Sequence, residues 1–196
     1  AITTASKYKK SKILALDLSF RSLSYAKRKA NEIKINNIDF IQGDILDLES
    51  IDRKFDIIES VGVLHHMDNP FKGWKILTSC LNNDSLMLIG LYSEKARQHI
   101  TQIRNKINKL KLQTNYKNII KFRKDLIDNN DDHWNYIKSS PDFYSVSGVR
   151  DLLFHVQEHR FTISKIKEYL DKLGLMFLGF EDQLVKENFK EIYSNK

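Results

Sequence analysis

The stretch that decides the fold is Phe55–Pro70, FDIIESVGVLHHMDNP. Its apolar side chains form a nearly continuous run from Phe55 to Leu64, which predicts a strand buried on both faces of a helix-covered parallel sheet. Polar residues follow, and Asn69-Pro70 opens a helix with proline at its first position. Because ligands bind outside the carboxyl ends of strands in open α/β sheets, we expect residues 59–66 to lie at a ligand site.

Two features of this stretch carry chemistry of their own. Gly62 lets the backbone come close to a ligand, and the paired His65 and His66 can move protons or hydrogen-bond a substrate. The alternative interpretation is a strand-to-helix loop whose histidines are solvated or pack locally. The residues alone leave both interpretations open.

Two preceding strands also end beside a carboxylate. Residues 12–18, KILALDL, predict a buried strand that ends at Asp17, and a shorter strand over 38–41 is followed by Asp44. A carboxylate accepts hydrogen bonds from two neighbouring hydroxyls, so Asp17 suits a ribose, whereas Asp44 suits the exocyclic amine of an adenine. Alternatively, each aspartate is a helix N-cap or part of a solvated turn.

The alternation of strands and helices continues after the histidines. We expect a helix, a turn at Asn82-Asn83-Asp84 and a buried strand over 85–92, and this order predicts a doubly wound α/β sheet. Residues 94–160 interrupt it with basic helices and a dense polar stretch. They predict a helical insertion within one domain of residues 1–196, which either caps the strand ends or forms a solvated hairpin.

The carboxyl-terminal part returns to the alternating pattern. Ser19 earlier in the chain and Thr162 here are both typical helix N-caps, and Gly174 is a suitable residue just after a helix. The run LMFLGF over 175–180 predicts a last strand, and residues 182–196 predict a polar, partly helical tail.

Composition limits the class of protein. With 196 residues, 41% of them hydrophobic, the chain is long enough for one domain with a sizeable core. Cys80 is the only cysteine, which argues against a disulfide framework and a cysteine zinc site, and we expect no metal. No apolar stretch is long enough to span a membrane and the amino end is not signal-like, so we expect a cytoplasmic protein without membrane contact.

The net charge of +7 favours an anionic partner, such as nucleic acid or a phosphorylated substrate. The excess lies in scattered lysines in a sequence rich in asparagine and isoleucine. This pattern indicates a bias in residue usage rather than a binding stripe, and no RNA-binding module is recognisable. The sequence therefore permits a nucleic-acid partner without favouring one.

Four motifs together carry a resemblance to a known family. ILALDLS, QGDI, FDIIESVGVLHHMDNP and RFTISKIKEYLDKLGLMFLGFE occur in the order and spacing of class I S-adenosylmethionine-dependent methyltransferases, which the chain resembles over nearly its whole length. DFYSVSGVRDLLFHVQEHRFT further resembles methyltransferase domains attached to tetratricopeptide repeats in bacterial proteins. The resemblance implies a Rossmann-like, mostly parallel sheet, S-adenosylmethionine as cofactor, possible tetratricopeptide repeats in the same gene product, and methyl transfer to an unidentified acceptor.

The same resemblance implies roles for individual residues. His65 and His66 would line the approach to the transferred methyl group and are the candidate catalytic bases. The cofactor contacts would come from three strand ends: Asp17 with Leu18, Gly43 with Asp44 and Ile45, and Ser60 with Val61 and Gly62. Candidate substrate residues lie in the insertion: Tyr144, Arg150, His155 and His159, with Arg160 also available for an anionic group.

Two parts of the family pattern are missing. The sequence begins after the glycine-rich loop that ends the family's first strand, and no final antiparallel strand follows Phe180. We therefore expect a fragment of a longer gene product, incomplete at its amino end. Its sheet should have a defect between the strands that end at Asp17 and Ser60.

Three other functions remain open at this level. A nucleotide-binding oxidoreductase is possible because Asp17 would hold the ribose of NAD equally well. The charge permits an RNA methyltransferase, and a non-catalytic interaction domain could keep the same fold. Gly43-Asp44 and the helix and strand that end at Phe180 favour the methyltransferase over the oxidoreductase.

Overall fold

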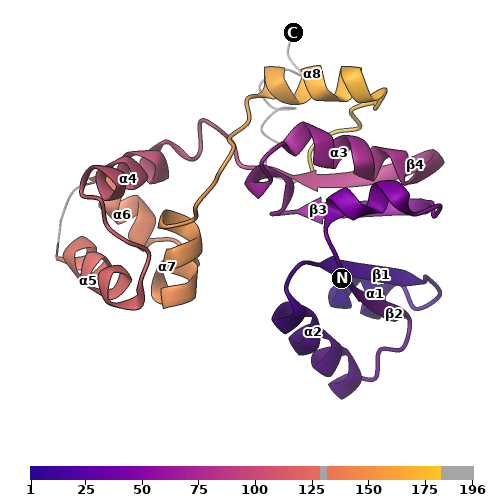
Figure 1. The fold of residues 1–196 in the computed structure, drawn as a ribbon, viewed down its shortest axis with the longest axis horizontal. Helices are drawn as coiled ribbons and strands as arrows, with labels where there is room; N and C mark the ends of the chain where they lie inside the picture. Colours follow the sequence, from indigo (N-terminus) through magenta and orange to yellow (C-terminus); the bar gives the residue numbers. More distant parts are fainter. Residues whose placement is uncertain (129–131, 182–196) are drawn as a thin grey trace, which may run out of the picture. The chain divides into compact units, whose positions relative to one another are not determined.

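A computed structural model of the chain describes residues 1–128 and 132–181. Their contacts divide the chain into two compact units. The first, here called the sheet unit, consists of residues 1–92 and 155–159. The second, the helical unit, consists of residues 93–154 and the chain from residue 160 onward. Figure 1 shows the elements of both units in the order of the sequence.

The sheet unit contains two pairs of parallel strands. β1 (Ile13–Asp17) pairs with β2 (Ile38–Gln42) along their whole length, from Ile13 opposite Ile38 to Asp17 opposite Gln42. β3 (Phe55–Val61) pairs with β4 (Leu81–Gly90). Parallel strands joined by helices agree with the predicted α/β class.

The two pairs of strands form separate sheets. β1 and β3 share no backbone ladder within the described residues, and each sheet has two strands. The predicted discontinuity between the strands that end at Asp17 and Ser60 is therefore present. Apolar side chains on one face of the second sheet remain exposed, namely Ile57, Val61 and Leu86.

Local capping explains where the helices of the sheet unit begin. The Ser19 hydroxyl accepts a hydrogen bond from Ser22 N at 3.2 Å and caps α2 (Phe20–Glu32). The Asn69 side chain accepts from Lys72 N at 3.0 Å and caps α3 (Pro70–Ser79), with Pro70 in the first turn. Both predicted helix starts are confirmed. A short helix, α1 (Ile2–Lys7), precedes β1.

α3 holds the loop after β3 in place. Trp74, Ile76 and Leu77 on this helix are buried, as is Leu64 in the single-turn helix η2 (Leu64–His66). Gly73 of α3 faces Met67 and Leu64, and a Cβ at Gly73 would clash with the Met67 side chain. Gly73 thus lies against Leu64 of η2, next to the backbone that carries His65 and His66.

Two sequence predictions about strands are wrong. Asn82-Asn83-Asp84 does not turn the chain but lies inside β4, where a register shift opposite Phe55–Ile57 absorbs the irregularity and Asp84 has a φ of 57°. Aspartate tolerates this left-handed conformation better than most residues, so a bulge replaces the turn. Residues 175–180 form no strand, and Met176 and Leu178 are largely exposed because no described segment pairs with them.

The helical unit has a core of its own. Its helices are α4 (Gln98–Lys109), α5 (Tyr116–Ile127), α6 (Asp132–Lys138), η3 (Pro141–Tyr144) and α7 (Val146–Leu153). α4 and α5 each pack against α6 and α7. One apolar cluster joins them; its most buried members are Ile103, Ile137, Val149 and Leu153. Ile100, Ile103 and Ile107 form the buried face of α4, whereas Leu110 just after it is 55% exposed.

The two ends of the helical insertion are joined by hydrogen bonds. Ser93 forms an isolated parallel bridge with Phe161, and Glu94 N donates to Phe161 O at 3.0 Å. Arg160 Nε donates to the Glu94 carboxylate at 3.1 Å. The insertion therefore begins and ends at one point of its own unit.

The last described helix is α8 (Ile163–Leu173). Thr162 caps it by accepting from Lys165 N at 3.2 Å, and Gly174 ends it with a φ of 66°, as the sequence predicts. Its apolar residues Ile166 and Leu170 are only partly shielded, and Ile163 is exposed. The predicted tail over 182–196 lies outside the described residues. No helix in the described part of the chain is long and apolar enough to cross a membrane.

Packing of η3 against α7 gives a stability prediction. A Cβ at Gly148 would clash with the backbone of Asp142, which cannot rotate away as a side chain can. We therefore expect Gly148→Ala to lower the free energy of unfolding by about 1–3 kcal/mol in urea denaturation. Ser147→Ala, at the exposed neighbouring position, should have little effect; equal stability of the two variants would contradict the packing described here.

Candidate cofactor and catalytic site

Asp17 is the last residue of β1 and is exposed. Its Oδ1 accepts a hydrogen bond from Ser19 N at 2.8 Å, which turns the chain from β1 into α2. The described residues leave its second carboxylate oxygen uncommitted. Leu18 beside it is 67% exposed, and its carbonyl accepts from the Gln42 side chain at 3.1 Å.

The end of β2 lies beside the end of β1. Gly43 N donates to Asp17 O at 3.2 Å, which places Gly43 and Asp44 next to Asp17. Asp44 caps the short helix η1 (Ile45–Ser50), because its Oδ1 accepts from Leu46 N at 2.9 Å. The capping role that the sequence left open is thus present, as a capping box in which the Asp44 and Asp47 side chains each accept from the other residue's backbone N–H. A carboxylate has about four lone-pair sites, so Asp44 retains acceptor capacity for a ligand. Ile45 begins η1 and is partly exposed.

The end of β3 offers a different surface. The Ser60 side chain is buried, and within the described residues its hydroxyl has no hydrogen-bond partner. Val61 is exposed. Gly62 has a φ of 78°, a conformation that glycine adopts without strain, and a Cβ placed there would meet no atom within 4 Å. An unpaired buried hydroxyl beside open backbone is suited to a polar ligand.

His65 and His66 have distinct surroundings. His65 is 1% exposed, and its ring stacks on Tyr92 with centroids 3.7 Å apart. His66 is partly exposed, and its Nδ1 lies 2.9 Å from Gln157 O. Because a carbonyl only accepts hydrogen bonds, Nδ1 carries the hydrogen and Nε2 is the basic nitrogen of the neutral ring. In this tautomer, Nε2 is the acceptor nitrogen of the His66 ring.

A remote segment, residues 155–159, packs on these histidines. His159 N donates to His65 O at 2.7 Å, and the His155 ring stacks on His66 with centroids 3.8 Å apart. The Gln157 side-chain nitrogen lies 3.1 Å from His159 Nε2 and 3.4 Å from Met67 O. Two of the predicted substrate residues are thus gathered with both predicted catalytic residues.

The other predicted substrate residues belong to the helical unit. Tyr144 in η3 and Arg150 in α7 are exposed. Arg160 donates to Glu94, so its guanidinium is already engaged by a carboxylate. Within the described residues, no cluster of three or more histidine, cysteine or acidic side chains is arranged to hold a metal.

Sequence reasoning missed two residues of this site, Tyr92 and Gln157. Tyr92 follows β4, the strand next to β3, so the rule that ligands gather at the carboxyl ends of parallel strands was a usable signal for it. No comparable signal marked Gln157, because its position depends on the packing of residues 155–159 against the histidines, which lie far away in the sequence.

Comparison with known proteins decides the family. Residues 2–138 match the family described as "Methyltransferase domain". The chain belongs to this methyltransferase domain family. The domain is 26% identical over 179 residues to the uncharacterized protein syc1184_c of a Synechococcus species, covering 87% of this chain and 43% of that protein. It is 30% identical to the probable (S)-tetrahydroprotoberberine N-methyltransferase 2 of Papaver bracteatum over 95 residues, 48% of this chain and 26% of that enzyme.

Solved structures show the same fold. PKMT2 from Rickettsia typhi in complex with AdoHcy superposes on 98% of this methyltransferase domain and 41% of its own chain, with a TM-score of 0.66 and 21% identity. Another structure of PKMT2 gives a TM-score of 0.70 at 19% identity over the same shares of the chains. The described fold is therefore the Rossmann-like α/β fold of methyltransferases. The chain spans less than half the length of these relatives.

Attachment of residues 155–159 to the histidines can be measured. We expect Gln157→Ala to raise the hydrogen-exchange rate of the His159 amide roughly three- to tenfold, because the variant loses the side-chain contacts that hold the segment. Val156→Ala is the matched control, since Val156 is 97% exposed and should leave exchange unchanged. Equal rates in both variants would show that Gln157 does not hold the segment.

Proposed function

We propose that this methyltransferase domain binds S-adenosylmethionine at the carboxyl ends of β1, β2 and β3 and serves methyl transfer from it. The observation that carries the proposal is the end of β3. There, the buried Ser60 hydroxyl lacks a partner among the described residues, and Gly62 presents open backbone. These groups fit a polar ligand, and the related PKMT2 binds AdoHcy.

The adenosine half of the cofactor fits the ends of β1 and β2. Asp17 has one carboxylate oxygen bound to Ser19 N and one uncommitted, so it can accept from ribose hydroxyls without losing its turn. Asp44 caps η1 through backbone N–H groups, and the remaining lone pairs of its carboxylate can accept from an adenine amine. The hydrogen bond from Gly43 N to Asp17 O keeps these two acceptors together.

The methionine half fits the end of β3. Ser60 can donate its hydroxyl hydrogen to a carboxylate or accept from an ammonium group, and Gly62 lets the backbone come close. When bound, S-adenosylmethionine supplies a methyl group already activated for displacement, so the protein's contribution is to position the acceptor and exclude water.

Deprotonation of the acceptor is the step for which this chain has a candidate group. His66 Nε2 is the basic nitrogen of its ring, and the Gln157 carbonyl at Nδ1 holds that tautomer. The His155 ring stacked on His66 restrains its orientation. His65 is buried against Tyr92 and positions the neighbouring ring rather than moving a proton.

A nitrogen nucleophile is the acceptor that the comparisons favour. A curated relative is named as an N-methyltransferase. An amine is protonated in water and attacks only after it loses a proton, which gives His66 a task. Tyr144 and Arg150 stay candidate substrate contacts, as exposed side chains of the helical unit.

A charge-neutral substitution tests the ribose contact. Asp17→Asn keeps an oxygen that accepts from Ser19 N but loses the carboxylate charge and one acceptor. We expect S-adenosylmethionine to bind about 1.5–3 kcal/mol more weakly in calorimetric titration. Asp39→Asn on β2 is the matched control, because Asp39 is exposed and lies opposite Leu14, away from the strand ends. An unchanged dissociation constant for Asp17→Asn would remove Asp17 from the site.

Ser60 gives a test in which stability and binding move separately. Ser60→Ala removes a buried hydroxyl without a described partner, so the free energy of unfolding should stay constant or rise. Affinity for S-adenosylmethionine should fall roughly three- to tenfold, the value of one hydrogen bond. Ser85→Ala on the neighbouring strand β4 serves as control. Lost stability without lost affinity would mean that Ser60 supports the fold rather than the cofactor.

A further inference from the structure

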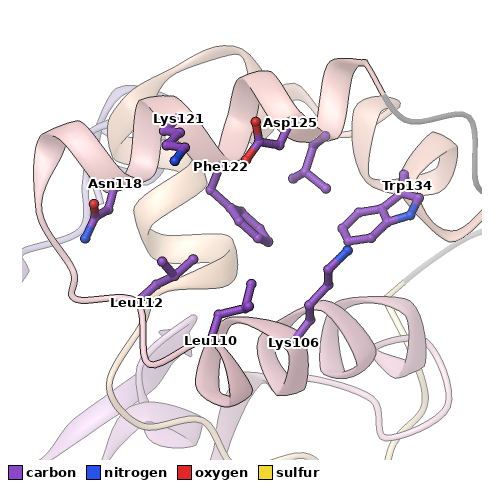
Figure 2. Close-up of a pocket in the computed structure, with 9 residues that line it drawn as sticks. Lys106, Leu110, Leu112, Asn118, Lys121, Phe122, Asp125 and Trp134 are labelled. Carbon is purple, nitrogen blue, oxygen red and sulfur yellow. The ribbon is translucent and has the colours of Figure 1, made fainter.

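The helical unit contains a cavity that the proposed methyl transfer does not use. It has a volume of about 320 Å³ and lies between α4, α5, α6 and the connection from α4 to α5. Figure 2 shows Phe122 pointing from α5 into this space, with Leu112 and Leu110 below it and Trp134 to one side. This volume lies in the range of sites that hold small molecules.

The walls of the cavity are mostly apolar. Phe122, Leu126 and Trp134 are buried parts of the core, whereas Leu110 is 55% exposed at the edge. A ligand with an apolar body would shield Leu110 from water. Burial of this exposed apolar surface would contribute favourably to the free energy of binding. The polar lining residues are Lys106, Asn118, Lys121 and Asp125.

Two of these polar residues are lysines on different helices. Lys106 reaches from α4 to the Trp134 ring, with its Nζ 4.5 Å from the ring centroid, and Lys121 extends from α5 on the other side of Phe122 (Figure 2). Neither lysine forms an ion pair with a carboxylate in the described part of the chain. Asp125 is the single carboxylate in the lining, so the two ammonium groups outweigh it.

The surrounding charge has the same sign. Residues 95–124 contain ten lysines and arginines and no aspartate or glutamate, and seven of the lysines are exposed. Lys117, Lys121 and Lys124 recur at helical spacing and share one face of α5. The potential at the cavity is therefore positive, and an anionic ligand is favoured over a cationic one.

We propose that this cavity binds a small amphipathic anion, with its carboxylate or phosphate between Lys106 and Lys121 and its flat apolar body against Phe122, Leu112 and Leu110. Asn118 Nδ2 donates one hydrogen to Gln113 O at 3.0 Å, and its second N–H can donate to the anionic group. All of its lining residues belong to the helical unit, and none of them is among the proposed cofactor residues.

A pair of probes of equal shape separates charge recognition from apolar binding. We expect 2-naphthoate to bind the whole chain at least tenfold more tightly than neutral 2-naphthamide in calorimetric titration. The chain has two tryptophans, so the indole N–H resonances report location. The Trp134 signal should shift on binding and the Trp74 signal should not.

Matched double variants then locate the charge. Lys106→Gln with Lys121→Gln should bring the two probe affinities to within about threefold of each other, whereas Lys109→Gln with Lys117→Gln should leave the tenfold preference intact. All four lysines are exposed on α4 and α5, and thermal unfolding should confirm that both double variants stay folded. Three outcomes would overturn the proposal. They are no saturable naphthoate binding up to its solubility limit, equal affinity for both probes, and an equal loss of naphthoate affinity in the two double variants. Binding of single-stranded nucleic acid that both double variants weaken equally, without naphthoate binding, would assign the basic surface to a polyanion instead.

Discussion

The arrangement of the candidate catalytic residues depends on one backbone hydrogen bond, from His159 N to His65 O at 2.7 Å. It joins the loop after β3 to residues 155–159, which follow the helices α4 to α7 in the sequence. A partly buried backbone N–H must find an acceptor, so this contact holds whatever side chain stands at position 159. With the segment fixed there, His155 stacks on His66 and the Gln157 carbonyl reaches its Nδ1. The side-chain chemistry follows from a main-chain constraint.

The hydrogen bond between His159 and His65 requires the two ends of the helical insertion to lie close together. The Ser93–Phe161 bridge and the Glu94–Arg160 ion pair meet this need within the helical unit. Because the helices bury their own apolar cluster around Ile103 and Val149, they need little from the sheet unit for stability. Their exposed surface is therefore free to carry the lysines of residues 95–124, which explains how a basic stretch is compatible with a folded unit.

Sequence reasoning succeeded where structure is set locally. Ser19, Pro70, Thr162 and Gly174 mark helix ends because each acts on backbone groups within four residues of itself. It failed where strand pairing decides the structure. Residues 175–180 have the composition of a strand but no described neighbour, and Asn82–Asp84 has the composition of a turn but forms an irregularity within β4. The position of the candidate cofactor residues at strand ends was predictable from the sequence. The contacts of Gln157 and the stacking of His155 on His66 were not, because they join residues that are far apart in the sequence.

The competing interpretations of the aspartates turn out to be compatible. The carboxylate of Asp17 accepts from Ser19 N, and that of Asp44 accepts from Leu46 N within a capping box. Such bonds fix the side chain while the carboxylate keeps other lone pairs, so the structural role is compatible with the proposed binding role. The two histidines differ in their surroundings: His65 is buried against Tyr92, whereas His66 is partly exposed. Identical neighbouring residues can therefore suit unlike roles, because one position faces the core and the next does not.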